Sequence, residues 1–356
     1  MRIERMRPDE VASATGGASI AYVPLGAIEY HGPHLPLGVD MMTSEEICRR
    51  ACARTGGVVL PPSYLSHGTL DLPWSLEFSP QLVEAWVREV VAQLHHQGFE
   101  MVVLLTGHGP LDFVHRLKRV ARESSKPGRA VYAACYLEFN AARLEGPELG
   151  EPTVIDHAST VETSYVLAID PLTVDLSALP DDPEASVVGV YGRNPRFTAD
   201  ARWAAQDMAA AGAVLSQRVR DAERGAFDDL ADLRRFVRLA WPESLQLRWT
   251  CDQEPMLELH NPGRASRFIT GLVDIVVDGV RLDPDCVYLC NSAAGESGSR
   301  LRGDSLGPES GLYLRRHQNA TIELPQGTPC GHGVSMSIEL GGVVCAQVRT
   351  DEGAPS

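Results

Sequence analysis

The sequence predicts an α/β part with a mainly parallel sheet flanked by helices, followed by a small all-β sandwich or barrel. Short apolar runs alternate with amphipathic stretches from about Ser19 to Glu223, which is typical of a helix-covered parallel sheet. From Trp241 onward, short β-branched runs separated by Gly, Pro and Asn turns indicate antiparallel strands. The length of 356 residues also exceeds that of one typical domain. We therefore expect one domain over residues 1–240 and another over 241–356.

Four apolar runs in the first part, each bounded by Gly or Pro, are the expected strands. They are SIAYVPL, GGVVLPP, EMVVLLTGHG and RAVYAACYL. Parallel sheets place ligands at the carboxyl ends of their strands. We expect the chemistry of the protein at that edge.

Two helix starts are visible between these strands. Thr43 with Glu46 has capping-box spacing ahead of Ile47, and Ser79 followed by Pro80 suits the N-cap and the first helical position. An apolar face follows the second start, made of Leu82, Val83, Trp86, Val87, Val90, Val91 and Leu94.

The strands expected in the second part are shorter and lie between turns. They are LQLRWT, RFITGLVDIVVDG, GLYLRR, ATIEL, VSMSIEL and VVCAQVRT. Their spacing indicates a small antiparallel sandwich or barrel.

Composition excludes several classes of partner. The formal charge of −15 argues against a nucleic-acid partner, because binding a polyanion needs a basic surface. The N-terminus has no apolar signal segment, and the apolar runs fall far short of the ~20 residues of a membrane helix. The eight Cys are scattered without a CxxC pair, so we expect free thiols in a reducing compartment. A cytoplasmic protein without a membrane or nucleic-acid partner follows.

Polar side chains follow the expected strands. Glu29 and His31 would project from one face of an extended chain, and Asp40 precedes the expected helix. His108 stands between two Gly just past an apolar strand, and Glu162 follows in IDHASTVETS. A single loop His is more often a hydrogen-bonded structural residue. Two His and three carboxylates at the strand ends of one sheet instead favour a pair of divalent cations.

Three motifs carry a resemblance to a known family. PLGAIEYHGPHLPLGVD resembles the signature of the creatininase family, which comprises creatinine amidohydrolases and relatives, including formamide hydrolases of flavin and deazaflavin biosynthesis and the mycofactocin peptidase. TGHGP resembles the Gly-His-Gly turn of that family, and DHASTVETS its His-Ala-Gly…Glu-Thr segment. The resemblance covers roughly residues 15 to 225 and implies the family's fold.

The resemblance also implies roles for individual residues. Asp40 would bridge two metal ions, and His157 would donate or shuttle a proton near the leaving nitrogen. Creatininase has an acidic ligand two residues after its Gly-His turn, where this chain has Pro110, so we assign the fifth ligand position to Glu162. The implied ligands are Glu29, His31, Asp40, His108 and Glu162, holding two divalent ions, with zinc preferred over manganese or iron.

Departures from the family pattern concern the substrate. Thr106, Leu111 and Ser159 replace residues that line the pocket in many relatives, which argues against creatinine itself. His67 and Trp74, in an altered loop, either face the pocket or pack within the loop.

Other His residues have weaker roles. His34 is expected to fix its loop rather than to bind a metal, and His95 and His96 to be solvated. His332 in PCGHG either packs in a turn, binds a metal or covers a neighbouring subunit's site.

The function predicted from these residues is hydrolysis, or in reverse formation, of a linear or cyclic amide C–N bond of a small molecule. An Ala-, Arg- and Gly-rich composition with an appended β domain suggests specialised biosynthesis. The resemblance implies a homo-oligomer, often a hexamer. The alternatives are a peptidase that trims a modified peptide and a non-catalytic metal-binding scaffold.

Overall fold

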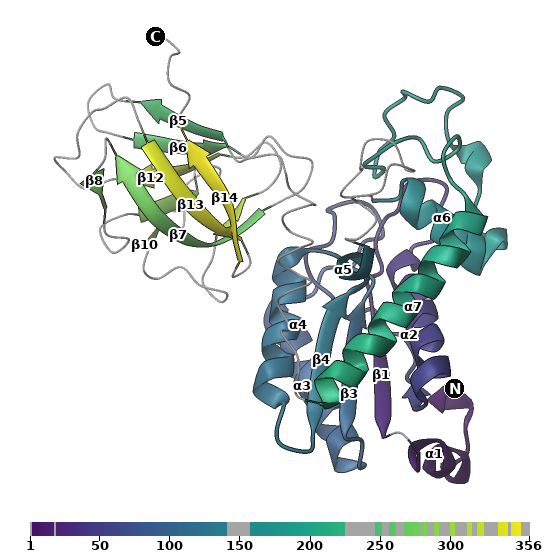
Figure 1. Cartoon of the computed structure of the whole chain (residues 1–356). Helices are drawn as coiled ribbons and strands as arrows, with labels where there is room; N and C mark the ends of the chain where they lie inside the picture. Colours follow the sequence, from purple (N-terminus) through teal and green to yellow (C-terminus); the bar gives the residue numbers. More distant parts are fainter. Residues whose placement is uncertain are drawn as a thin grey trace. The chain divides into compact units, whose positions relative to one another are not determined.

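The computed structural model describes residues 2–17, 19–140 and 157–224, and, further along the chain, the strands named below. The chain divides into two compact units, Met1–Phe236 and Val237–Ser356. Figure 1 shows the elements of each unit.

The first unit is built on a parallel sheet. All three strand pairings are parallel, and the order across the sheet is β2-β1-β3-β4. The strands coincide with the four runs predicted from sequence: β1 (Ile20–Leu25), β2 (Val58–Val59), β3 (Met101–Thr106) and β4 (Ala130–Cys135). Every residue of β1 and β3 is buried, as expected for a sheet covered on both faces.

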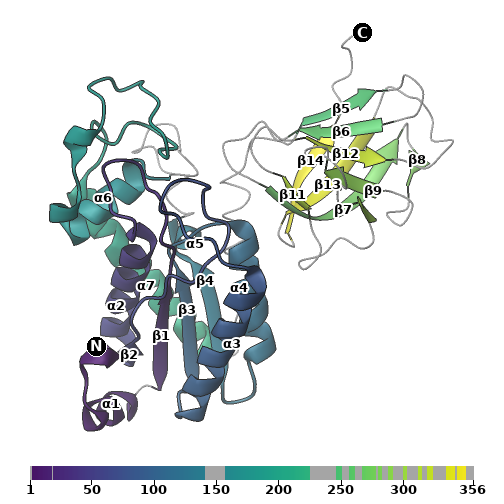
Figure 2. The ribbon, with the colours of Figure 1, turned by 180° about the vertical axis from the view of Figure 1, so that it is seen from behind.

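Helices cover both faces of this sheet, which confirms the predicted fold class. In Figures 1 and 2, α2 (Val39–Thr55) and α7 (Ala201–Glu223) lie on one face, and α3 (Pro80–His96) and α4 (Leu111–Ser124) on the other. The remaining helices are α1 (Pro8–Thr15), α5 (Tyr136–Asn140), α6 (Thr160–Ile169) and the 3₁₀ turns η1 (Ile3–Arg5), η3 (Pro171–Thr173) and η4 (Leu176–Ala178).

The cap predicted for α3 is confirmed. The Leu82 amide donates to the Ser79 hydroxyl at 3.3 Å, with Pro80 at the first helical position. The predicted apolar face holds for its inner residues, because Val83, Val87 and Val91 are each 1% exposed. Leu82 is 50% exposed, so its inclusion in this face was wrong.

The predicted start of α2 was wrong. The first helical hydrogen bond runs from the Met42 amide to the Gly38 carbonyl at 3.0 Å, so Thr43 lies inside the helix. Asp40 therefore belongs to the first turn of α2 and not to a preceding loop. The expectation for His95 was also wrong, because its ring is 6% exposed and Nδ1 lies 2.9 Å from the Phe99 carbonyl.

The described strands of the second unit form two antiparallel sheets, with orders β10-β9-β12-β6-β5 and β11-β7-β13-β14, and β8 pairs with β7. Whether they form a sandwich or a barrel stays a prediction, and His332 lies outside the described residues. The strands are β5 (Gln246–Thr250), β6 (Met256–His260), β7 (Arg267–Val277), β8 (Val280–Arg281), β9 (Tyr288–Asn291), β10 (Arg300–Arg302), β11 (Leu312–Leu314), β12 (Asn319–Glu323), β13 (Val334–Leu340) and β14 (Val343–Arg349).

A helix that spans a membrane must be both long and apolar. None of the described helices combines the length and the apolar character needed to cross a bilayer.

Candidate metal centre

Asp40 reaches the carboxyl end of the sheet because the first turn of α2 packs directly against the end of β3. A Cβ atom on Gly107, the residue after β3, would lie 2.0 Å from the Asp40 carbonyl oxygen. Only glycine permits this approach. The turn after β3 also carries His108. The Thr106 hydroxyl holds this turn by accepting a hydrogen bond from the His108 amide at 2.9 Å. Thr106 thus fixes the turn that carries His108.

The two carboxylate oxygens of Asp40 face different imidazoles. Oδ2 lies 3.0 Å from His108 Nδ1, and Oδ1 lies 3.3 Å from His31 Nε2. Glu29 Oε2 lies 3.2 Å from the same His108 nitrogen, and Glu162 Oε2 lies 3.5 Å from the same His31 nitrogen. Asp40 therefore joins two sets of three ligand atoms: group A (Glu29, Asp40, His108) and group B (His31, Asp40, Glu162).

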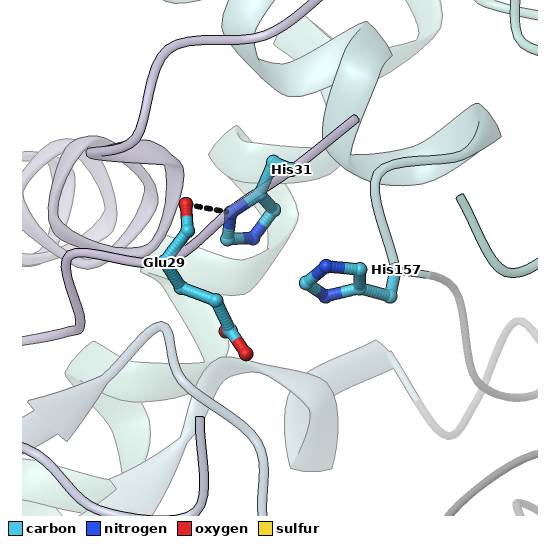
Figure 3. A group of neighbouring side chains, drawn as sticks. All are labelled: Glu29, His31 and His157. Carbon is cyan, nitrogen blue, oxygen red and sulfur yellow. Dashed lines mark hydrogen bonds between the residues drawn. The ribbon is translucent and has the colours of Figure 1, made fainter. Parts of the chain in front are cut away.

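His31 presents its outer nitrogen to group B. Its Nδ1 lies 3.0 Å from the Glu29 backbone carbonyl, which can only accept, so Nδ1 carries a hydrogen (Figure 3). Nε2 faces two carboxylate oxygens and has no hydrogen-bond partner among the described residues. A buried nitrogen in this position needs either a proton or a metal ion between it and the carboxylates.

Backbone amides hold the outer carboxylates. The Leu70 amide donates to Glu29 Oε1 at 2.6 Å, and the Ala158 amide donates to Glu162 Oε2 at 2.6 Å. Such contacts orient ligand oxygens before an ion arrives. Tyr136, at the end of β4, donates to Glu162 Oε1 at 3.5 Å. Sequence reasoning missed Tyr136, because the predicted run RAVYAACYL included it in the strand, whereas β4 ends at Cys135 and Tyr136 follows the strand end.

His157 lies beside the two groups, on a segment separate from the loop of Glu29 and His31 (Figure 3). Its ring centroid is 4.3 Å from that of His31, and with Glu29 and His31 it makes a third candidate ligand group. Its Nε2 lies 2.9 Å from the Tyr30 carbonyl, so Nε2 donates a hydrogen and Nδ1 keeps a lone pair. His157 can therefore accept a proton at Nδ1.

Burial and mutual attraction set the charges of these side chains. Burial alone would lower the pKa of His31, but Glu162 and Asp40 raise it to about 10. Burial likewise opposes the charge on His108, and Glu29 and Asp40 raise its pKa to about 10. Burial would raise the pKa of Asp40, but the two imidazoles hold it below its usual value. Without a metal, protons on His31 and His108 balance the carboxylates.

The donor set fits divalent cations. Glu29, His31, Asp40, His108 and Glu162 are all at most 5% exposed, and they offer carboxylate oxygens and imidazole nitrogens, which suit zinc or manganese. The structure thus brings together the five ligand positions predicted from sequence, with His157 beside them.

Other residues singled out in the sequence belong to none of the ligand groups found among the described residues. Trp74 is 76% exposed, whereas His67 is 3% exposed and His34 is 1% exposed. His34 contributes no atom to the candidate groups found among the described residues.

Comparison with protein families decides the relationship. The family model described as "Creatininase: Creatinine amidohydrolase" matches residues 4–232, more than half of the chain. The chain belongs to the creatininase family. It is therefore a metal-dependent hydrolase that acts on amide C–N bonds.

Individual relatives agree with this membership. A creatinine amidohydrolase of Pseudomonas putida is 26% identical over 191 residues, which span 49% of this creatininase-family chain and 74% of the relative. A structure of a mutant creatininase of the "Zn-Zn type" is 21% identical with a TM-score of 0.51, covering 62% of this chain and 97% of that one. Another, titled "Creatininase Mn", is 21% identical with a TM-score of 0.52, at the same coverages. The structural likenesses show a shared fold.

Proposed function

We propose that this protein holds two divalent cations, one on group A and one on group B, with Asp40 bridging them. It uses them to hydrolyse, or in reverse to form, the C–N bond of a small linear or cyclic amide. The observation that carries the proposal is the division of the Asp40 carboxylate between His108 at 3.0 Å and His31 at 3.3 Å. One carboxylate shared by two sets of ligands suits a pair of ions that lie close together.

A bound pair of divalent cations lowers the pKa of water and polarises a carbonyl group, which is the chemistry that amide hydrolysis needs. The side chains of this chain supply the rest. The hydrogen bonds from Leu70 and Ala158 hold Glu29 and Glu162, so both carboxylates keep their orientation through the reaction. Asp40 is only 2% exposed and supplies a carboxylate oxygen to each group.

His157 moves the proton in this proposal. Burial and the nearby His31 lower its pKa to about 4, so the ring is neutral near pH 7. Its Nε2 hydrogen is bonded to Tyr30, and Nδ1 is left to take a proton from the attacking water. The same nitrogen then returns the proton to the departing amide nitrogen, which is a poor leaving group until it is protonated.

Metal content tests the proposal. We would measure it by plasma mass spectrometry on chelator-free protein, beside the double variant Glu29→Gln/His108→Ala, which removes two of the three ligands of group A. Two equivalents per chain in the wild type, reduced in the variant, would support the proposal and justify a screen of amides and lactams. No metal in the wild type, even after reconstitution with zinc and manganese, would overturn it.

The finer parts of the proposal follow the sequence and the relatives. We propose zinc as the preferred ion, a cytoplasmic homo-oligomer, and a role in specialised biosynthesis. We also propose that residues 1–240 form the metallohydrolase domain and residues 241–356 a separate β domain. Sedimentation of the metal-loaded protein tests the oligomer, and limited proteolysis tests the domain boundary.

A further inference from the structure

His34 lies between two ligand positions, His31 and Asp40, but contributes to neither metal group. Its side chain is only 1% exposed. A buried imidazole outside the ligand set needs a physical reason, because burying a polar ring without partners costs stability.

The ring of His34 is bonded to the helix that carries Glu162. Its Nε2 lies 2.8 Å from the hydroxyl oxygen of Thr163, the residue after Glu162 on α6. The Thr163 hydroxyl donates its only hydrogen to the Ala158 carbonyl at 3.5 Å. His34 therefore donates from Nε2 to Thr163. This chain of hydrogen bonds ends at Ala158, whose own amide holds Glu162.

The backbone of His34 is held as well. Its carbonyl accepts a hydrogen bond from the Asp175 amide at 3.0 Å, which ties the loop to the segment after α6. Gly32, at φ +70°, lets the ring lie close to the loop, because a Cβ atom there would be 2.9 Å from His34 Nδ1 and 2.8 Å from a Val190 methyl group. Ring and backbone together connect the loop of His31 to α6.

We propose that His34 is a positioning residue for group B: through Thr163 it fixes the loop of His31 relative to the helix of Glu162. This inference rests on the proposed two-ion centre. Group B draws its ligands from three separate segments: the loop of His31, the first turn of α2 with Asp40, and α6 with Glu162. The His34–Thr163 hydrogen bond directly joins two of them.

Group A does not depend on this bond. His108 is held by its own turn through Thr106, and Glu29 is held by the Leu70 amide. Loss of His34 should therefore weaken the ion on group B and leave the ion on group A in place. A general loss of folding would weaken both ions together, so the two outcomes can be told apart.

The test is zinc titration of the full-length protein against a chromophoric chelator, with His34→Ala beside the wild type. Loss of a group that orients ligands typically costs about 10- to 100-fold in metal affinity. We expect the dissociation constant of one zinc ion to rise by that factor while that of the other stays within about threefold of the wild-type value. His34→Gln, which can still donate to Thr163, should recover most of the affinity.

A matched control and a second pair of variants complete the test. His95→Ala removes another buried imidazole, one bonded to the Phe99 carbonyl at the end of α3, and should leave both zinc affinities unchanged. Thr163→Val removes the hydroxyl and should reproduce the effect of His34→Ala, whereas Thr163→Ser should not. This pair decides the matter if His34→Ala does not fold.

The possible results separate this inference from the proposed function. Two zinc ions bound with wild-type affinities in both His34→Ala and Thr163→Val would overturn the positioning role and leave the two-ion centre intact. Equal weakening of both ions would overturn it as well, because His34 would then support the fold and not group B. Failure of the wild type to bind two ions would instead refute the proposed function.

Discussion

The replacement Asp40→Asn tests the two-ion centre most directly. Asn has nearly the shape of Asp, so packing around the 2%-exposed side chain changes little, while the negative charge shared by the two groups is lost. Group A then keeps Glu29 and His108, and group B keeps His31 and Glu162. Asn offers one neutral oxygen where Asp offers two charged ones, so both ions lose the shared negative charge and one of them loses a ligand atom. We expect both ions to bind much more weakly.

The size of the effect can be expressed as a thermal shift. An ion bound only to the folded state adds about 2.7 kcal/mol to the free energy of unfolding when free zinc is at about 100 times its Kd. A domain of about 150–250 residues gains about 2–4 °C in Tm per kcal/mol. Each ion should thus raise the wild-type Tm by about 5–11 °C, and both together by about 10–20 °C. In Asp40→Asn, zinc should raise the Tm by less than about 3 °C.

Differential scanning calorimetry with and without a chelator measures these shifts, and metal analysis of the same samples counts the ions. Asp112→Asn is the matched control, because Asp112 is a buried carboxylate paired with Arg116 on α4 and belongs to neither group. The control should keep the full zinc-dependent shift. If Asp40→Asn keeps two ions and the wild-type rise in Tm with zinc, the bridging role is refuted. If the variant loses only one ion, Asp40 serves only one group, and the other group needs a different third ligand.

Three further predictions follow from the same geometry. Glu162→Gln should lose only the ion of group B and about half of the zinc-dependent Tm shift, and loss of both ions would contradict the division into two groups. His157→Ala should keep two equivalents of metal but lower kcat by about 10²- to 10⁴-fold on any lactam found in a screen, and an unchanged kcat would remove His157 from proton transfer. In metal-free protein, the pKa values of His31 and His108 are raised from 6.5 to about 10. The protonated imidazoles therefore stabilise the folded state fully below pH about 6.5, and this stabilisation is lost as the pH rises toward 10. The Tm of chelated protein should fall over this range, and a flat profile would show that these imidazoles do not carry protons in the metal-free state.

The sequence by itself determined the α/β fold class and the strands of the sheet. Each strand is a continuous apolar run, because both of its faces are covered by helices, and such runs are visible without any tertiary information. The cap of α3 was visible for a similar reason, since Ser79 and Pro80 act on their own backbone. The candidate ligands were found because they follow strand ends or stand in motifs that resemble the family.

Only the tertiary structure decided how those ligands are grouped. The start of α2 was misplaced from sequence because a side-chain cap was assumed, whereas the helix begins at Val39, after the N-cap residue Gly38, and Asp40 lies in its first turn. The division of Asp40 between His108 and His31 depends on the approach of α2 to Gly107, a contact between residues far apart in the chain. Local sequence patterns indicate the conformation of a segment but not which distant segments it contacts. The hydrogen bond between His34 and Thr163, for example, joins residues 129 positions apart. The residue types of the centre are therefore readable from the sequence, while their pairing, burial and shared charge arise only when the strand ends and helix starts are packed together.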